Sequence, residues 1–190
     1  MMNDKKVVRT RVKESLQSLG KTLYEDYSHK IARTLFEEDE WKTAKTIGIY
    51  ISRKPEVDTY QIIRRAWDEG KQVVVPKCNP IDKTLSFRTL TDFSQLESVY
   101  YGLWEPIVSV TNKISSEMID LIIVPGLAYT RDGFRLGFGG GFYDRFLSNY
   151  SGKTLSLAFH LQIIPHFPVE KHDIPVSKII TDQEVIKAKC

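Results

Sequence analysis

The sequence has little of what marks several classes of protein. Cys78 and Cys190 are its only cysteines and form no CxxC pair, so we expect neither a disulfide framework nor a thiolate metal site, with Cys190 exposed. No apolar run is long enough to cross a membrane, and the N-terminus lacks an apolar signal core, which predicts a cytoplasmic protein. A net charge of +3 is too small to indicate nucleic-acid binding.

Common catalytic and nucleotide-binding motifs are missing as well. The four histidines show no metal-ligand spacing, and no Ser, His and Asp residues form a known nucleophile motif. The P-loop pattern G-x-x-x-x-G-K-[ST] is absent. Gly137 and Gly139 begin a dinucleotide-binding fingerprint, but Phe142 stands where its third glycine would be.

The composition is that of an ordinary globular protein. The 190 residues are 42% hydrophobic and 27% charged, which predicts a single domain over residues 1–190. We expect a monomer with no nucleic-acid or membrane partner. The acidic run Glu37–Glu40 is expected to be a solvated helix end.

Hydrophobic periodicity predicts alternating helices and strands. Helical spacing over the first forty residues is interrupted at Gly20, and a third helix begins near Asp58 and ends near Gly70. The strands are expected at Thr46–Ile51, Gln72–Val75 (ended by Pro76), Met118–Val124, Thr154–Phe159 and Val176–Ile180. This order indicates an α/β fold, in which a mostly parallel sheet is flanked by helices on both faces in a Rossmann-like three-layer architecture. Ligands of such sheets bind at the carboxyl ends of the strands.

The most informative segment is the glycine-rich stretch from Arg135 to Arg145. Four glycines fall within residues 137–141, so backbone N–H groups can close around an anion without a Cβ in the way. Helical spacing follows, which places the loop before a helix N-terminus, a favourable site for phosphate. The flanking arginines favour phosphate binding over the alternative, a flexible turn between two elements.

Other candidate residues each have a structural alternative. Lys5 and Arg9 share one helix face and can clamp a triphosphate, or they belong to a solvated face. Asp144 falls in a first helical turn, where a carboxylate is favourable without any metal. Trp104 can stack on a flat ligand or belong to the core. Glu56 lies in a loop after a strand, where a carboxylate is usually solvated.

The stretch Arg135–Asp144 also resembles the signature R-L-G-x-G-x-G-[YF]-Y-D of the 5-formyltetrahydrofolate cyclo-ligase family, also called methenyltetrahydrofolate synthetase. Phe142 is a mild departure, because tyrosine is common there. The resemblance extends over nearly the whole chain. It includes Lys5–Arg9, Ile51-Ser52 with Glu56–Thr59, Val75–Lys77, Trp104–Pro106 and Asp120–Gly126.

The resemblance implies the roles of the site residues. The expected ATP-binding residues are Lys5, Lys6, Val7, Val8, Arg9, Arg135, Leu136, Gly137, Phe138, Gly139, Gly140, Gly141, Phe142 and Tyr143. The expected folate-binding residues are Ile51, Glu56, Trp104, Phe138, Gly139, Gly140, Gly141 and Phe142. Asp144 and Asp173 are the expected magnesium ligands, as hard oxygen donors suit this ion. Lys77 and Arg131 are further candidates for phosphate or folate contacts, and Glu105 has no assigned role.

The resemblance implies an ATP- and magnesium-dependent enzyme. It would convert 5-formyltetrahydrofolate to 5,10-methenyltetrahydrofolate and release ADP and phosphate through a phosphorylated formyl group. The alternative is a binding module for a nucleotide or sugar phosphate without turnover, since a fold alone does not determine function. Glu56, Asp144 and Asp173 distinguish the two, because a phosphate sensor would not need them.

Overall fold

The computed structural model describes residues 4–189, so Cys190 lies outside the described residues. Five α-helices are found in this range: α1 (Lys5–Gln17), α2 (Lys21–Glu37), α3 (Asp39–Thr43), α4 (Tyr60–Asp68) and α5 (Phe142–Leu147). The strands are β1 (Thr46–Gly48), β2 (Gln72–Asn79), β3 (Thr84–Thr89), β4 (Leu96–Ser98), β5 (Trp104–Pro106), β6 (Lys113–Ile114), β7 (Leu121–Ile123), β8 (Ala128–Tyr129), β9 (Arg135–Leu136), β10 (Lys153–Leu157), β11 (Lys178–Ile180) and β12 (Val185–Lys187). None of the described helices is long and apolar enough to cross a membrane.

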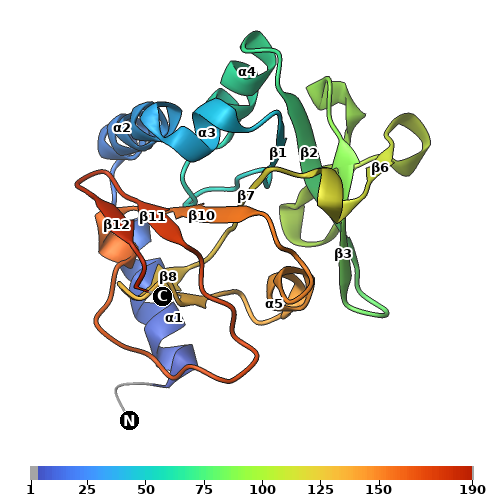
Figure 1. Ribbon diagram of the computed structural model, residues 1–190. Helices are drawn as coiled ribbons and strands as arrows, with labels where there is room; N and C mark the ends of the chain where they lie inside the picture. The colour runs from blue at the N-terminus through green and yellow to red at the C-terminus, as the bar shows by residue number, and fades with distance from the viewer. Residues whose placement is uncertain (1–3, 190) are drawn as a thin grey trace.

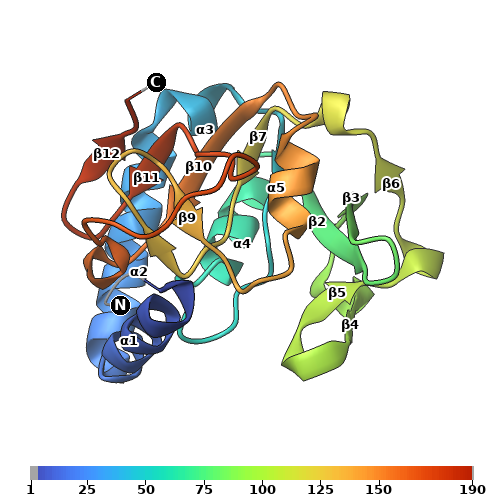
Figure 2. The ribbon, with the colours of Figure 1, turned by 90° about the horizontal axis from the view of Figure 1, so that it is seen from below.

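The centre of the fold is an eight-stranded sheet in the order β12-β11-β10-β7-β1-β2-β3-β6. The five strands from β11 to β2 are parallel, whereas β12, β3 and β6 are antiparallel additions at the edges. Helices α2, α3 and α4 cover one face, and α5 lies on the opposite face (Figures 1 and 2). The expected α/β architecture is therefore confirmed.

Residues at the helix ends determine where the helices begin and end. Asp4 precedes α1 and accepts a hydrogen bond from the Lys6 amide at 3.0 Å. Asp58, one residue before the N-cap Thr59 of α4, accepts from the Tyr60 amide at 2.9 Å and from the Gln61 side chain at 3.2 Å, so it supports the helix start without forming a capping box. Gly70, just past α4, has φ of +73°, a conformation that favours glycine.

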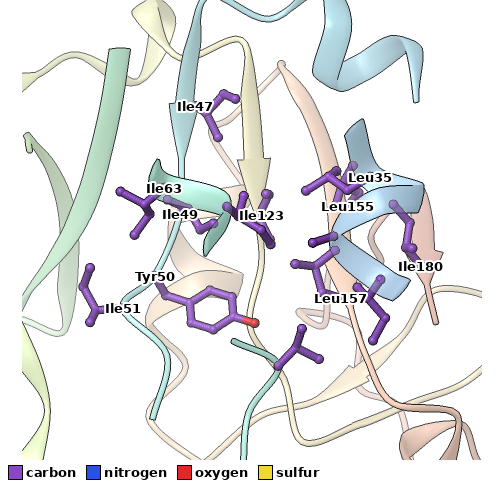
Figure 3. Packing of buried hydrophobic residues seen from close by; sticks show 14 of the residues in the cluster. Leu35, Ile47, Ile49, Tyr50, Ile51, Ile63, Ile123, Leu155, Leu157 and Ile180 are labelled. Carbon is purple, nitrogen blue, oxygen red and sulfur yellow. The ribbon is translucent and has the colours of Figure 1, made fainter. Parts of the chain in front are cut away.

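The apolar spacing of the helices matches the core that they cover. Val8, Val12 and Leu16 of α1 are buried in the same cluster as the inner faces of α2 and α4 and one side of the sheet. Figure 3 shows this cluster, in which Ile47 and Ile49 lead along the chain to Tyr50 and Ile51. A second cluster on the opposite face contains Leu147 of α5. The core thus holds the loop after β1 at one end of the sheet.

Several expected boundaries were wrong. The first strand ends at Gly48 rather than Ile51, although the Ile49 amide still donates to Val74 at 3.0 Å. Strand β2 does not end at Pro76 but continues to Asn79. Its parallel partner β1 ends opposite Val74, so the missing N–H of Pro76 interrupts no ladder on that side. Edge strand β12 had no sequence signal.

The acidic run Glu37–Glu40 is only partly the solvated helix end that we expected. Glu37 and Asp39 are exposed, but Glu38 and Glu40 are half-buried and pair with Lys178 at the start of β11. The Lys178–Glu40 distance is 2.8 Å, and only 10% of the Lys178 side chain is exposed. The carboxylates therefore neutralise a nearly buried cation, a contact across 138 residues that the sequence pattern cannot reveal.

Candidate active site

The glycine loop, residues 137–141, joins β9 to α5 and is open to solvent for most of its length. Gly139 and Gly141 have φ of +108° and +71°, conformations that side-chain-bearing residues rarely adopt. Phe138, just before Gly139, is exposed, whereas the Tyr143 hydroxyl is buried with no hydrogen-bond partner among the described residues. The loop therefore presents backbone rather than side chains, as anion binding requires.

Helix α1 carries one cation to this loop and a second to the Asp173 carboxylate. The Arg9 Nε donates to the Gly137 carbonyl at 2.9 Å, and the Lys5 Nζ lies 3.5 Å from the Asp173 carboxylate. Their spacing of four residues puts both on the face that the sequence predicted. Lys6 and Val7 are exposed, and Val8 is part of the core. Of the expected ATP-binding residues in α1, the structure thus brings Arg9 to the loop and Lys5 to Asp173.

Arg135 and Asp144 form a nearly buried ion pair behind the loop. The Arg135 Nη2 lies 2.9 Å from the Asp144 Oδ1, and the side chains are 5% and 17% exposed. Asp144 also accepts the Ile174 amide at 3.1 Å. The Arg135 Nε is buried with no partner within residues 4–189. Buried donors normally have an acceptor, so this one is an exception within the described residues.

Asp173 lies beside Ile174, so the Asp144 contact with Ile174 joins the two expected metal ligands. Asp173 belongs to the polar stretch from Glu170, which by sequence alone would be expected at the surface. Its side chain is nevertheless only 10% exposed. Its carboxylate accepts the Glu170 amide at 2.9 Å. Glu170, His172 and Asp173 also offer ligand atoms within 4.8 Å of one another. Sequence spacing did not single out Glu170 or His172, because neither has a partner at a metal-binding interval.

Glu56 is turned back onto its own loop. Its Oε2 accepts the Arg53 amide at 2.7 Å, its amide donates to the Arg53 carbonyl at 2.9 Å, and its carbonyl accepts the Tyr24 hydroxyl at 2.9 Å. Burial raises the pKa of the Glu56 carboxyl to about 7, although the hydrogen bond and charge of Arg53 lower it. Glu56 is therefore not the solvated loop carboxylate of the structural alternative.

The ends of the loop around Glu56 are held by a pair of hydroxyl side chains. The Ser52 amide donates to the Thr59 hydroxyl at 2.9 Å, and the Thr59 amide donates to the Ser52 hydroxyl at 3.0 Å. The Thr59 hydroxyl in turn donates to the Tyr50 carbonyl at 2.8 Å. These bonds fix the loop relative to the end of β1 and leave Ile51 buried behind it.

Three buried tyrosines lie within electrostatic reach of Glu56, and one of them belongs to the helix that follows the glycine loop. Tyr50, Tyr129 and Tyr143 come from the end of β1, from β8 and from α5. Burial raises the pKa of each hydroxyl, and the charge of Glu56 contributes in all three cases. Glu56 is thus within electrostatic reach of the helix that follows the glycine loop. The sequence analysis missed Tyr50 and Tyr129, because buried tyrosines usually belong to a core.

The remaining candidates differ in their exposure and in their partners. Trp104 in β5 is 48% exposed, so the core alternative is wrong. Glu105 accepts the Cys78 amide at 2.7 Å, which gives it a structural role between β5 and β2. Lys77 lies within β2 and 3.4 Å from Glu97, and Arg131 pairs with Glu184 at the surface. These last two cations already have carboxylate partners.

A hollow of about 490 Å³ lies elsewhere, over α2 and α4. It is lined by Lys30, Arg33, Thr34, Phe36, Glu37, Arg65 and Asp182. None of the expected site residues belongs to it. The chemistry-bearing groups instead surround the open glycine loop, which suits a large ligand with exposed phosphates better than a small enclosed one.

Comparison with known proteins identifies the family of this chain. The family model described as the 5-formyltetrahydrofolate cyclo-ligase family matches residues 1–182. The 5-formyltetrahydrofolate cyclo-ligase of Haemophilus influenzae is 30% identical over 178 residues, covering 91% of this chain and 95% of the relative. The enzyme of the same name from Escherichia coli K12 is 33% identical over 146 residues, covering 75% and 80%.

Solved structures give the same result. The 5,10-methenyltetrahydrofolate synthetase of Aquifex aeolicus, solved by NMR, superimposes with a TM-score of 0.86 at 27% identity. The match covers 100% of this chain and 94% of that one. With the family model matching almost the whole sequence, this chain belongs to the 5-formyltetrahydrofolate cyclo-ligase family.

Proposed function

We propose that this protein is an ATP-dependent ligase that cyclises 5-formyltetrahydrofolate to 5,10-methenyltetrahydrofolate, with ADP and phosphate as the other products. The observation that carries the proposal is the placement of Arg9 and Arg135 at the glycine loop, with Lys5 at the Asp173 carboxylate and Glu56 within electrostatic reach. Family membership identifies the substrate. A phosphate sensor would not need the carboxylates, so we favour the enzyme over the binding module.

ATP is proposed to bind with its phosphates along the loop. Arg9 reaches the loop from α1 and Lys5 lies beside Asp173, while Arg135 lies behind the loop and its Nε has no partner among the described residues. These side chains would neutralise the charge that develops during phosphoryl transfer, and loop amides would hold the phosphate oxygens. Lys6, Val7 and Val8 would contribute through their backbone or flank the site, because their side chains point elsewhere.

Folate is proposed to bind on the opposite side of the buried tyrosines. The ionised carboxylate of Glu56 can accept hydrogen bonds from the N–H groups of the pterin ring, because only Oε2 is bonded to Arg53. Ile51, Trp104 and the loop residues Phe138–Phe142 would contact the flat ring system. The exposed ring of Trp104 is suited to stacking on it.

The reaction needs an activated oxygen, because the formyl oxygen is a poor leaving group. We propose that the γ-phosphoryl group passes to this oxygen, after which N10 of the folate attacks the carbon and phosphate departs. No protein nucleophile takes part, so the chain only positions the reactants and neutralises charge.

Magnesium fits the same site. Asp144 and Asp173 are joined through Ile174 and offer carboxylate oxygens, the ligands that magnesium prefers together with phosphate and water. Asp144 is paired with Arg135, and Asp173 with Lys5. The ion would supply charge neutralisation at the phosphates.

We further propose that residues 1–190 act as one monomeric domain in the cytoplasm. The single large sheet takes strands from residues 46 to 187, which supports one domain. Light scattering of the purified protein would measure the mass, and twice the chain mass would contradict the monomer.

Mixing protein, ATP, magnesium and 5-formyltetrahydrofolate should produce the absorbance of methenyltetrahydrofolate. One ADP should form per product. If ATP binds but neither product appears, the binding module is the better account.

A second test concerns the phosphorylated intermediate. A heavy oxygen isotope in the formyl group should appear in the released inorganic phosphate, because the formyl oxygen keeps its bond to phosphorus. Label recovered in water would instead indicate dehydration without phosphorylation.

The metal assignment predicts that Asp173→Asn raises the magnesium concentration for half-maximal rate, on the order of tenfold. The same variant should lose the magnesium-dependent rise in melting temperature measured with ATP present. Asp132→Asn, at an exposed carboxylate between β8 and β9, serves as the matched control. An unchanged magnesium dependence would show that Asp173 has only its structural role.

A further inference from the structure

Arg53 stands between two parts of the folate side of the site. Its backbone closes the turn with Glu56 through two hydrogen bonds, one to the carboxylate and one from the amide. Its guanidinium extends the other way and donates from Nη1 to the carbonyl of Tyr101. Arg53 thus contacts the Glu56 loop and the β4–β5 hairpin at once.

The β4–β5 hairpin is a separate two-stranded sheet beside β2. Its tip is a single 3-10 turn, η2 (Tyr100–Gly102), in which Tyr101 and Gly102 both have positive φ, at 57° and 70°. This turn presents the Tyr101 carbonyl to Arg53. The tip is strongly exposed, since 88% of Tyr101 is accessible, and Trp104 at the start of β5 follows the tip after Leu103.

The attachments of the hairpin differ at its two ends. Near its base, Glu105 accepts the Cys78 amide of β2 at 2.7 Å. At the tip, the bond from Arg53 joins the hairpin to the substrate loop. A rigid tip matters because an exposed aromatic side chain binds a flat ligand well only when its position is fixed beforehand.

We propose that Arg53 is a positioning residue for folate, which holds the Trp104-bearing hairpin against the Glu56 loop through its guanidinium. The inference rests on the proposed function and adds a residue that contacts neither the phosphates nor the loop glycines. In this role the η2 turn supplies the acceptor for Arg53, which is the Tyr101 carbonyl.

Arg53 has a second effect through its charge. The titratable groups that face Glu56 from the packed elements are Tyr24 of α2, Tyr50, Tyr129 and Tyr143. All four hydroxyls have raised pKa values and stay neutral in any ordinary assay. The charge of Arg53 lowers the pKa of Glu56, against the larger effect of burial. Removing this charge should therefore raise the pH below which folate binding is lost.

The test uses Arg53→Ala, which keeps the backbone bonds to Glu56 and removes only the guanidinium. The KM for 5-formyltetrahydrofolate should rise about three- to tenfold, with kcat and the KM for ATP unchanged. The acid limb of kcat/KM should move to higher pH. Direct titration with 5-formyltetrahydrofolate in the absence of ATP should show the same loss of affinity.

Two further variants separate the effects. Arg53→Lys should restore the acid limb, because it keeps the charge, and recover only part of the affinity, because one ammonium cannot reproduce the guanidinium geometry. Lys54→Ala removes the adjacent exposed cation, which lies over Tyr24 rather than on the hairpin, and should leave the KM unchanged.

If Arg53→Ala matches an active wild type in KM and pH profile, the inference is wrong while the proposed function stands. If Lys54→Ala raises the KM equally, surface charge alone explains the effect and the positioning role is wrong. A wild-type protein that forms no product would contradict the proposed function, and the inference with it.

Discussion

Glu56→Gln should weaken folate binding and, at the same time, make the protein more stable above neutral pH. Gln keeps an oxygen for the Arg53 amide but lacks the charge that accepts strong hydrogen bonds from the pterin. We expect kcat/KM for 5-formyltetrahydrofolate to fall roughly ten- to a hundredfold, corresponding to about 1.5–3 kcal/mol, with ATP affinity unchanged. The acid limb near pH 7 should disappear with the carboxyl that causes it.

The stability change has the opposite sign because burial disfavours the ionised form. The Glu56 carboxyl pKa is raised from 4.5 to about 7 in the fold, so the unfolded chain releases this proton first as pH rises. Wild-type stability is therefore lost between about pH 4.5 and 7 relative to the Gln variant, and the difference is constant above that window. Glu56→Gln should melt higher than wild type at pH 8 and equally at pH 4.

Melting curves at both pH values measure this difference. Glu14→Gln, at an exposed carboxylate in α1, is the control and should change the melting temperature little at either pH. Equal melting of Glu56→Gln and wild type at pH 8 would contradict the burial of the charge. Wild-type kinetics for both substrates would contradict the folate contact.

Arg135→Ala should both abolish ATP binding and destabilise the fold. The variant leaves Asp144 with a nearly buried charge and only the Ile174 amide as partner. Breaking such a pair from one side costs about 3–5 kcal/mol, more than the loss of any exposed pair. Urea denaturation would measure the stability, and calorimetry with ATP the binding.

A double variant separates the two losses. Arg135→Ala with Asp144→Asn removes both charges, so it should recover much of the stability while ATP still fails to bind. Arg65→Ala removes an arginine from an exposed pair with Glu69 and should cost less than about 1 kcal/mol. Normal ATP affinity in folded Arg135→Ala would disprove the phosphate role of Arg135.

The sequence predicted the parts of the site that depend on local pattern. The glycine loop and the spacing of Lys5 and Arg9 on one helix face are contained in short segments, and the structure has them as expected. The alternating strands and helices likewise predicted the parallel sheet. In each case neighbouring residues determine the feature, through backbone freedom or helical periodicity.

The parts that were missed depend on contacts between distant segments. Lys178 is neutralised from 138 residues away, and Arg53 reaches Tyr101 across 48 residues. Strand β2 passes through Pro76 because its neighbour ends early, which no local rule reveals. Such contacts cannot be predicted from local sequence patterns, because the residues meet only after the helices and strands have packed.

The contact between Lys5 and Asp173 joins residues 168 positions apart. During synthesis on the ribosome, helix α1 emerges first and has to wait for nearly the whole chain before its partner appears. Closing so long a segment costs conformational entropy that only the finished sheet can offset. A nascent chain that stops before Asp173 would therefore contain the glycine loop, but Lys5 would lack this carboxylate partner. The protein should therefore become able to bind ATP only late in folding, after most of the core has formed.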